Sequence, residues 1–518
     1  MRALLVQARS PRSYWSFERS LPFIGKAAAL APLGLVTLAA HLPERWELRL
    51  HDLNVAPLSD ADLRWAEAVL VSAMLVQAPS AREVLRRARA LGRRSVAGGA
   101  GPSTAPELFP DADHLFRGEA EGRLDLLVHA LEAPELTAPR LLSPEGPERP
   151  DLSLARVPRF DLLDLQRYAN HCLQFSRGCP FRCEFCDIIE LFGRVPRVKS
   201  PRQVLAELDS LYERGARGAL FFVDDNFVGN RREVERLLPA IRAWQDAHGF
   251  PFQFCTEASI DLAETPALVS AMVAAGFEEV FVGIETPSAD ALRGSGKTQN
   301  LRIPVERAVE VLTGAGLEVF AGFIVGLDGE GPDIFDRQVE LISSLPIPRA
   351  MAGLLTVLPG TRLWRRLEQE GRLRPGIGAD NFDRPNFEPE MDERALLAGY
   401  RRLLGTLYDP VRYYERCALV LERLPARGPA ASIHAPRESL AALVRIVWGV
   451  GIRSPRRWRF WRLVAQALRL GFRKLPRALV LAVLGESLIP YTEEVVLPRL
   501  DRSLSALDQK AQRKVASA

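Results

Sequence analysis

The segment Cys179-Pro-Phe-Arg-Cys183-Glu-Phe-Cys186 places three thiols within eight residues. Thiolates are the ligands of iron–sulfur clusters, and cysteines on one loop can converge on a single cluster. Three cysteines leave the fourth iron of a [4Fe–4S] cluster open to another molecule. The alternative is a zinc site with a distant fourth ligand, although this spacing fits zinc ribbons poorly and the nearest histidine, His171, precedes the motif. The segment therefore favours a [4Fe–4S] centre held by Cys179, Cys183 and Cys186.

The residues around this motif, 165–375, repeat a strand followed by a helix six times. Apolar residues at positions i, i+3 and i+4 mark the helices. Because a complete barrel needs eight such units, we expect an open, partial (β/α)6 barrel. The expected strands are Cys172–Ser176, Ala219–Val223, Phe252–Cys255, Glu279–Ile284, Val319–Val325 and Ala352–Val357. The expected helices include Val204–Arg214, Val234–Trp244, Pro266–Ala275, Val305–Ala315 and Phe335–Ser344.

Short apolar runs alternate with helical patterns in the N-terminal zone, residues 1–132. This alternation predicts a doubly wound, Rossmann-like α/β domain, whose ligand lies beyond the carboxyl ends of its strands. The expected strands are Arg2–Gln7, Glu47–Leu50, Ala68–Ser72 and Ser95–Ala97, and the expected helices are Pro32–Leu42 and Ala81–Leu91.

Two further zones complete the chain. Residues 133–164 are rich in Pro, Glu and Arg and show little periodicity, which predicts a linker. Residues 376–518 are helical and basic, and Arg453–Arg473 sets arginines among aromatic residues such as Trp458 and Trp461. This stretch is either an interfacial patch that contacts a membrane or a pair of amphipathic helices that pack on the barrel. We favour the second interpretation.

The composition is typical of a folded soluble protein: 47% of the residues are hydrophobic and 25% are charged. The net charge of +4 is small for 518 residues, and nothing in it predicts a nucleic-acid partner. The N-terminus has no cleavable signal pattern, and no window holds the roughly 18 apolar residues of a spanning helix. Cys172, Cys255 and Cys417 are scattered, unlike a disulfide framework. We therefore expect a cytoplasmic protein.

Residues 165–375 resemble the core of radical S-adenosylmethionine (SAM) enzymes, whose open iron chelates SAM and passes it one electron. Phe185, just before the third cysteine, matches an aromatic position of that family. The other matches stand at carboxyl ends of expected strands, where barrel active sites are built. The resemblance implies that Phe185, Asp224, Asp225, Glu257, Gly283, Glu285 and Gly322 contact SAM, although Asp-Asp-Asn after a strand is also typical of a helix cap.

Residues 1–132 resemble the cobalamin-binding domain fused to many radical SAM enzymes. Ser72-Ala73-Met74, Gly98-Gly99-Ala100-Gly101-Pro102-Ser103 and Gly118-Glu119-Ala120-Glu121-Gly122 match three loops of that domain. The resemblance implies cobalamin contacts from Ser72, Met74, Gly98, Gly99, Pro102, Gly118 and Glu119. A cofactor-free flavodoxin-like domain is the alternative.

The cobalt is expected to lack a histidine ligand. The Asp-x-His-x-x-Gly element that supplies one in some cobalamin proteins is absent after the first strand, and His41 and His51 lie elsewhere. The loop Met74–Gln77 is the candidate to face the lower side of the cobalt.

The run from Arg177 to Pro196, and that from Tyr408 to Arg416, are similar to the hopanoid 2-methyltransferase group and its uncharacterised relatives. This similarity implies that one SAM methylates cobalamin, while another yields a 5′-deoxyadenosyl radical that abstracts hydrogen from the substrate. The substrate radical then takes the methyl group from methylcobalamin. The expected partners are a hydrophobic, polycyclic substrate and an electron donor such as flavodoxin or ferredoxin. The sequence assigns no catalytic side chain.

Three other functions compete with methyl transfer to carbon. The same cofactors can support a rearrangement or oxidation without methyl transfer. A methylthiotransferase acting on tRNA would need a further N-terminal cysteine set and a small basic domain, and the sequence has neither. A cobalamin sensor or carrier would not need the Cys179/Cys183/Cys186 set.

Overall fold

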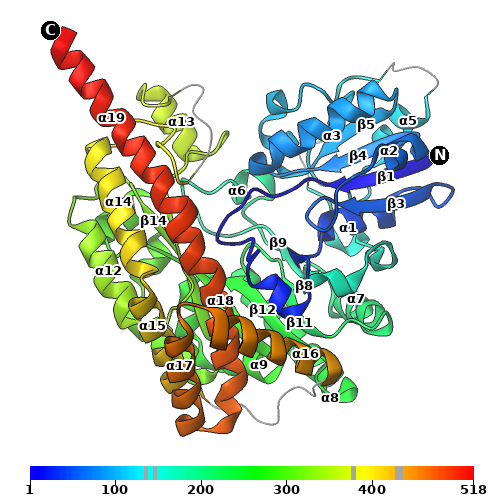
Figure 1. Cartoon of the computed structure of the whole chain (residues 1–518). Helices are drawn as coiled ribbons and strands as arrows, with labels where there is room; N and C mark the ends of the chain where they lie inside the picture. The colour runs from blue at the N-terminus through cyan, green and yellow to red at the C-terminus, as the bar shows by residue number, and fades with distance from the viewer. Residues whose placement is uncertain (134–137, 144–148, 375–380, 426–435, 518) are drawn as a thin grey trace. The chain divides into compact units, whose positions relative to one another are not determined.

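The computed structural model describes residues 1–133, 138–143, 149–374, 381–425 and 436–517. The chain forms two compact units, each built from several segments (Figure 1). The first unit comprises Met1–Arg12, Lys26–Pro180 and Asp187–Asp225, and the second comprises Ser13–Gly25, Phe181–Cys186 and Asn226–Ala518.

A parallel sheet with a core on each face forms the N-terminal part of the first unit. Alternate residues of its strand β1 point to opposite faces, so Leu4 and Val6 enter one core while Ala3 and Leu5 enter the other. The doubly wound α/β domain expected here is confirmed. In sheet order the strands are β3 (Glu47–Asp52), β1 (Arg2–Gln7), β4 (Ala68–Ser72), β5 (Arg94–Gly98), β6 (His114–Phe116) and β7 (Leu141–Leu142). The helices are α1 (Leu33–His41), α2 (Asp60–Trp65), α3 (Ala78–Ala90), α4 (Ala100–Thr104) and α5 (Asp125–Glu132).

The partial barrel begins in the first unit. Its strands there are β2 (Ala28–Leu30), β8 (Tyr168–Leu173) and β11 (Gly218–Phe222), which pair in parallel. β9 (Ser176–Arg177) and β10 (Arg197–Val198) form a short antiparallel pair after β8, and α6 (Ile188–Leu191) and α7 (Pro201–Glu213) complete this part. The sequence prediction missed β2 because three residues are too few for a periodic signal.

The remaining barrel strands lie in the second unit and pair in parallel in chain order: β12 (Phe252–Ala258), β13 (Phe277–Glu285), β14 (Glu318–Val325) and β15 (Ala350–Leu354). The associated helices are α8 (Arg231–His248), α9 (Pro266–Ala274), α10 (Ala289–Gly294), α11 (Val305–Ala315) and α12 (Ile334–Ser344). These elements confirm the predicted partial barrel of parallel strands.

Several expected elements differ in position from the prediction. The expected strand Ala352–Val357 lies earlier, as β15. The expected strand Cys172–Ser176 begins and ends earlier, as β8, because the backbone N–H groups of Phe175 and Ser176 donate to the carboxylate of Asp224 instead of continuing the sheet. Part of the expected linker forms β7, which adds an edge strand to the first sheet. Two leucines are too short a run to predict a strand.

Helices make up the rest of the second unit: α13 (Arg362–Gln369), α14 (Glu393–Leu407), α15 (Pro410–Arg423), α16 (Pro436–Ile446), a π-helical turn (Val447–Arg453), α17 (Arg457–Leu470), α18 (Leu475–Tyr491) and α19 (Leu497–Ser517). α14 lies along both α12 and α19 (Figure 1). The N-terminal segment Ser13–Gly25 is part of this unit. Its Tyr14 is buried, contacts Thr492 through a 2.7 Å hydrogen bond between the two hydroxyls, and stacks on Tyr408 at 4.9 Å.

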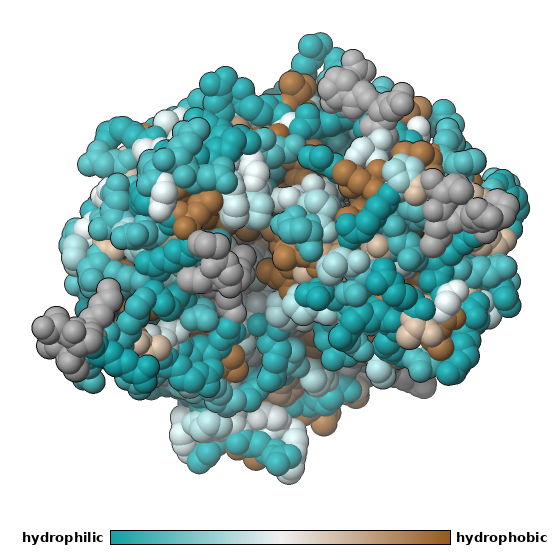
Figure 2. Space-filling model, turned by 90° about the horizontal axis from the view of Figure 1, so that it is seen from above, coloured by the Kyte–Doolittle hydropathy of each residue, from teal (hydrophilic) through white to brown (hydrophobic). Residues whose placement is uncertain are grey.

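Hydrophilic residues predominate on the face drawn in Figure 2, and its apolar residues form small patches. Among the helices of the described residues, none combines the length and the apolar composition needed to cross a bilayer.

Candidate functional site

The residues predicted to contact cobalamin lie at the carboxyl ends of three adjacent strands, β4, β5 and β6. The loop after β4 and the loop after β5 are joined by hydrogen bonds from Ala73 N to Gly98 O (3.1 Å) and from Gly101 N to Ala73 O (2.9 Å). Gly118, after β6, donates its backbone N–H to the Ser103 hydroxyl at 3.0 Å. The structure thus brings Ser72, Met74, Gly98, Gly99, Pro102 and Gly118 to one edge of the sheet, and their contact with cobalamin stays a prediction.

The loop Met74–Gln77 presents its first side chain to solvent. Met74 is 52% exposed, while Gln77 is buried and fixes the loop by accepting from Met74 N (2.8 Å) and donating to Ala8 O (2.9 Å). His51 contacts Ala56 O at 3.0 Å through its Nε2, and burial lowers the pKa of His41. His51 lies outside the three loops, whereas His41 interacts electrostatically with Glu121 of the loop after β6.

Contacts within the protein require glycine at two positions of the loop after β5. Gly99 has φ +99°, and a Cβ on it would lie 3.0 Å from Ala73 O. A Cβ on Gly101 would lie 2.8 Å from the carbonyl carbon of Met74. A Cβ on Gly98 would meet Phe116 at an ordinary 3.7 Å. The close approach of the β4 and β5 loops therefore depends on Gly99 and Gly101.

Gly101→Ala is expected to force the two loops apart, at a cost of about 1–3 kcal/mol in unfolding free energy, and to weaken cobalamin binding. Gly34→Ala, at an exposed glycine of α1 where a Cβ would meet nothing within 4 Å, is the matched control and should leave cobalamin binding unchanged without lowering the unfolding free energy. Cobalamin titration followed by visible absorption, together with thermal unfolding, measures the two effects. Equal behaviour of the two variants would contradict the role given to Gly101.

Glu119 and Glu121 hold the segment that leads to the first cysteine. Both carboxylates are buried, and Arg177 binds Glu119 at 2.6 Å and Glu121 at 2.8 Å. Arg197, on β10, binds Glu119 at 2.7 Å. Burial acts to raise the pKa of Glu121, but Arg177 outweighs it and lowers that pKa to about 2. Glu119, predicted to contact cobalamin, uses both of its carboxylate oxygens on these arginines, and its cobalamin contact stays a prediction.

Glu121→Gln is expected to destabilise the protein at pH 6 by about 3 kcal/mol, and the difference should shrink as the pH falls from 4.5 towards 2. The pKa of Glu121 is depressed in the fold, so its contribution is present above the ordinary value of 4.5 and is lost as the pH falls through about 2. Urea unfolding at pH 6 and pH 3 measures the difference. Glu83→Gln, at an exposed glutamate of α3, should show neither effect.

Asp224 and Asp225 position the backbone before the cysteines. Asp224 accepts from Phe175 N at 3.1 Å and from Ser176 N, and Asp225 accepts from Gly178 N at 2.7 Å. Burial raises the pKa of Asp224 to about 7 and that of Asp225 to about 6. These carboxylates therefore anchor the chain between β9 and Cys179, and their predicted contact with SAM stays untested.

Lys297 lies beside two of the predicted cluster ligands. It binds Glu285, and burial acts to lower its pKa, but the negative charges of Glu285, Cys183 and Cys186 outweigh burial and raise that pKa. Gln299 donates its side-chain amide to Cys183 Sγ at 3.6 Å. A cation and an amide donor beside thiolates suit a [4Fe–4S] cluster, because both stabilise negative sulfur.

Gly283 leaves room for this ion pair. A Cβ on it would overlap Glu285 Oε1 and Lys297 Nζ, and Glu285 adopts φ +66°, which is uncommon for a side-chain-bearing residue. The glycine of the motif Val282-Gly283-Ile284-Glu285 is therefore explained by the space that the ion pair between Glu285 and Lys297 occupies. Lys297 was missed from the sequence because it follows α10 rather than a strand.

One face of the β12–β14 sheet carries the remaining SAM candidates. Glu257 pairs in register with Phe281, and Gly283 pairs with Gly322. A Cβ on Gly322 would lie 2.9 Å from the ring of Phe281. The structure brings these candidates onto adjacent strands, and their contact with SAM stays a prediction.

An aromatic cluster, Trp15, Phe281 and Phe320, lies on the same face. The Phe281 and Phe320 rings are 5.2 Å apart, and Trp15 stands edge-on to them at 5.5 and 6.3 Å. Trp15 remains 46% exposed. Two residues along β13 separate Phe281 from Gly283, a rise of about 7 Å. No pattern in the sequence indicated Trp15, which lies more than 260 residues from both phenylalanines.

Four charged side chains form a layer below the aromatic cluster. Arg349 binds Glu279 and Glu318 at 2.9 Å each, and Arg477 of α18 binds the same carboxylates at 2.7 and 3.2 Å. Glu318 and Arg349 are buried. Glu279 and Glu318 stand at the beginnings of their strands, so this ionic layer lies at the opposite end from Glu285.

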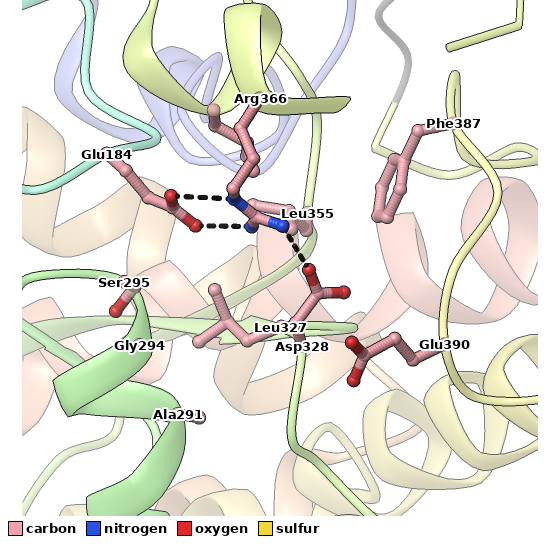
Figure 3. Close-up of a pocket in the computed structure, with 11 residues that line it drawn as sticks. Glu184, Ala291, Gly294, Ser295, Leu327, Asp328, Leu355, Arg366, Phe387 and Glu390 are labelled. Carbon is pink, nitrogen blue, oxygen red and sulfur yellow. Dashed lines mark hydrogen bonds and ion pairs between the residues drawn. The ribbon is translucent and has the colours of Figure 1, made fainter. Parts of the chain in front are cut away.

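A pocket of about 190 Å³ lies behind the cysteine motif, and Figure 3 shows Arg366 of α13 beside it. Arg366 binds Glu184, between Cys183 and Cys186, at 2.8 Å, and Asp328 also at 2.8 Å (Figure 3). Phe185 packs on the apolar core that borders this pocket, and its contact with SAM stays a prediction. Glu184 and Phe185 thus fasten the cysteine loop to the second unit.

Family models match three parts of the chain. The B12 binding domain matches residues 27–128, and the Radical SAM superfamily matches residues 173–342. A domain of unknown function, DUF4070, matches residues 361–498.

Two relatives match nearly the whole length. The Uncharacterized methyltransferase sll1242 of Synechocystis is 39% identical over 501 residues, which cover 96% of this chain and 92% of the relative. The Hopanoid C-2 methylase of Rhodopseudomonas palustris is 34% identical over 503 residues, which cover 95% of this chain and 94% of the relative.

Solved structures agree on the fold. The radical SAM methyltransferase TsrM from Kitasatospora setae, with cobalamin and a [4Fe–4S] cluster bound, gives a TM-score of 0.61 at 18% identity, covering 86% of this chain and 99% of that one. The cobalamin-dependent radical SAM enzyme OxsB gives a TM-score of 0.61 at 15% identity, covering 98% and 83%.

The fold and the cysteine site define a cobalamin-dependent radical SAM enzyme, which uses a [4Fe–4S] cluster, SAM and cobalamin. Within that class the chain belongs to the methyltransferase family that includes hopanoid C-2 methylase. The predicted radical SAM methyltransferase and its cofactors are confirmed. These matches favour the cluster over a zinc site, a cobalamin domain over a cofactor-free one, and methyl transfer over rearrangement.

Proposed function

We propose that this methyltransferase adds a methyl group to an unactivated carbon of a hydrophobic, polycyclic molecule. The aromatic cluster of Trp15, Phe281 and Phe320 carries the proposal, because the exposed Trp15 ring, supported by Phe281 and the buried Phe320, can bind fused aliphatic rings through apolar contact. The cluster lies on the same sheet face as Gly283 and Gly322, near the residues expected to hold SAM. The relative named as a hopanoid methylase supports this class of substrate.

Different groups of residues in this chain have different roles in the proposed reaction. Cys179, Cys183 and Cys186 hold the cluster, and Lys297 with Gln299 stabilises the negative charge of the sulfurs. The loops after β4, β5 and β6 hold cobalamin. When bound, the cluster and SAM supply the radical that removes a hydrogen atom, and cobalamin supplies the methyl group. The protein's part is to keep the substrate carbon in apolar surroundings, where water does not intervene.

We propose that the reductant is an acidic protein such as flavodoxin or ferredoxin. Arg182, between two of the cysteines, is exposed, and Arg362 donates to its carbonyl at 3.3 Å. Exposed arginines beside a cluster favour association with an acidic donor. None of the six cysteines, all of which lie in the described residues, is paired in a disulfide, which suits a reducing compartment, and we place the protein in the cytoplasm.

The test supplies methyl-labelled SAM, a reductant and hopanoid-type polycyclic substrates under anaerobic conditions. Label should appear on a carbon of the product, with S-adenosylhomocysteine and 5′-deoxyadenosine formed in roughly equal amounts. Trp15→Ala should raise KM for the substrate. The variant should still cleave SAM when no substrate is present. Trp65→Ala, in the first unit, is the control and should not change KM.

Two results would overturn this proposal. Product with 5′-deoxyadenosine but without S-adenosylhomocysteine would exclude methyl transfer and favour rearrangement. Methylation of small polar molecules alone, with Trp15→Ala indistinguishable from the parent, would exclude the apolar substrate site.

A further inference from the structure

An exposed apolar stripe runs along α16 and the π-helical turn that follows it. Leu440, Val444, Trp448 and Ile452 recur every four residues and are 62%, 60%, 57% and 50% exposed. The opposite face of the same segment is buried, with Ile446 and Val450 in the interior and Gly449 against Phe23. The segment therefore has two apolar faces, one buried within the unit and one exposed to solvent. Packing within the unit does not explain the exposed face.

α17 extends the stripe with two tryptophans. Trp458 is 74% exposed and Trp461 is 40% exposed. The Trp461 indole N–H donates to Gly451 O at 2.9 Å, which ties α17 to the π-helical turn beside Ile452. We call Leu440, Val444, Trp448, Ile452, Trp458 and Trp461 the C-terminal apolar patch.

The segments that carry this patch are rich in positive charge. Residues 439–485 contain ten arginines and lysines and no aspartate or glutamate, and two of the ten, Arg456 and Arg477, are paired with carboxylates from elsewhere in the unit. Arg453 and Arg462 are exposed, and Arg457 lies over the Trp458 ring at 5.8 Å. Arginines whose stems cover apolar surface can direct their guanidinium groups to an anionic layer above it.

We propose that the C-terminal apolar patch binds the surface of an anionic lipid bilayer. Tryptophans and leucines enter the boundary between headgroups and acyl chains, and the arginines contact lipid phosphates. A second copy of this chain fits the patch less well, because a two-fold contact would bring like charges together. α17 buries Phe460 and Leu463 and contacts α15 and α18, and the patch occupies the other face of these helices.

The test is sedimentation of the full-length protein with vesicles. It should pellet with vesicles of phosphatidylcholine and phosphatidylglycerol in equal parts, and remain in solution with phosphatidylcholine alone. Rising salt should reduce binding. The Trp448→Ser/Ile452→Ser and Arg453→Glu/Arg462→Glu variants should each lower the partition coefficient about tenfold.

Matched controls stand outside the patch in the same unit. Val411→Ser, at a valine that is 40% exposed, and Arg502→Glu, at an exposed arginine of α19, should bind vesicles like the parent protein. Circular dichroism checks that every variant keeps its helices. Equal binding by patch and control variants, or no binding to the anionic vesicles, would overturn the proposal. So would a dimer in sedimentation velocity that the patch variants abolish without any vesicle binding.

Discussion

Cys183→Ala is expected to lose the cluster and, with it, the cleavage of SAM. Anaerobically reconstituted parent protein should hold about four irons per chain and form 5′-deoxyadenosine when reduced. Cys183 is buried and faces Gln299, and a methyl group cannot replace its thiolate. Iron analysis, visible absorption and chromatographic detection of 5′-deoxyadenosine measure the loss.

Cys172→Ala is the matched control for this change. Cys172 is a buried cysteine of β8, and burial raises the pKa of its thiol to about 12, so it behaves as a small apolar side chain. The control should keep its irons and its activity. A Cys183→Ala protein that retained both would refute the ligand assignment.

Arg477→Met is expected to lower the unfolding free energy of the second unit by about 3–5 kcal/mol. Arg477 and Arg349 balance Glu279 and Glu318 in the ionic layer, and they hold the pKa of Glu279 low against the effect of burial, at about 2. Removing one arginine leaves a buried negative charge without compensation. Urea unfolding followed by circular dichroism measures the change.

A control variant and a rescue variant test this prediction further. Arg469→Met, at an exposed arginine of α17, should change stability little. Adding Glu318→Gln to Arg477→Met restores the charge balance and should recover part of the loss. An Arg477→Met protein within about 1 kcal/mol of the parent would show that the layer is worth no more than a surface pair.

Local patterns were enough to predict most of the barrel. Val305–Ala315 matches its helix at both ends, and Ala68–Ser72 matches its strand, because apolar periodicity of 3.6 or 2 appears directly in the sequence. The cysteine spacing predicted a [4Fe–4S] cluster, which the family match confirms, because the three predicted ligands share one loop. Boundaries set by distant groups were not predictable. β8 ends where Asp224, 49 residues away, binds the backbone.

The site residues missed from the sequence share one property. Lys297, Trp15 and the four charges of the ionic layer come from segments far apart in the chain, and each is chemically ordinary where it stands in the sequence. Gly283 and Gly322 were assigned to SAM from their motifs. In the structure, a Cβ on either glycine would meet protein atoms, Lys297 in one case and Phe281 in the other. The sequence patterns indicated that glycine was needed at these positions. They did not indicate which protein atoms occupy the space where a side chain would lie.

The burial of Tyr14 among the C-terminal helices has a consequence for biosynthesis. Tyr14 and Thr492 are 478 residues apart, so a ribosome adding 5–20 residues per second takes roughly half a minute to a minute and a half between them. Throughout that interval the surface on which Tyr14 docks is incomplete, whereas Trp15 packs on Phe281 and Phe320, which are made earlier. The burial of Tyr14 is therefore completed only after α18 has been made, and a nascent chain stalled before α18 would leave the Tyr14 ring available to chaperones.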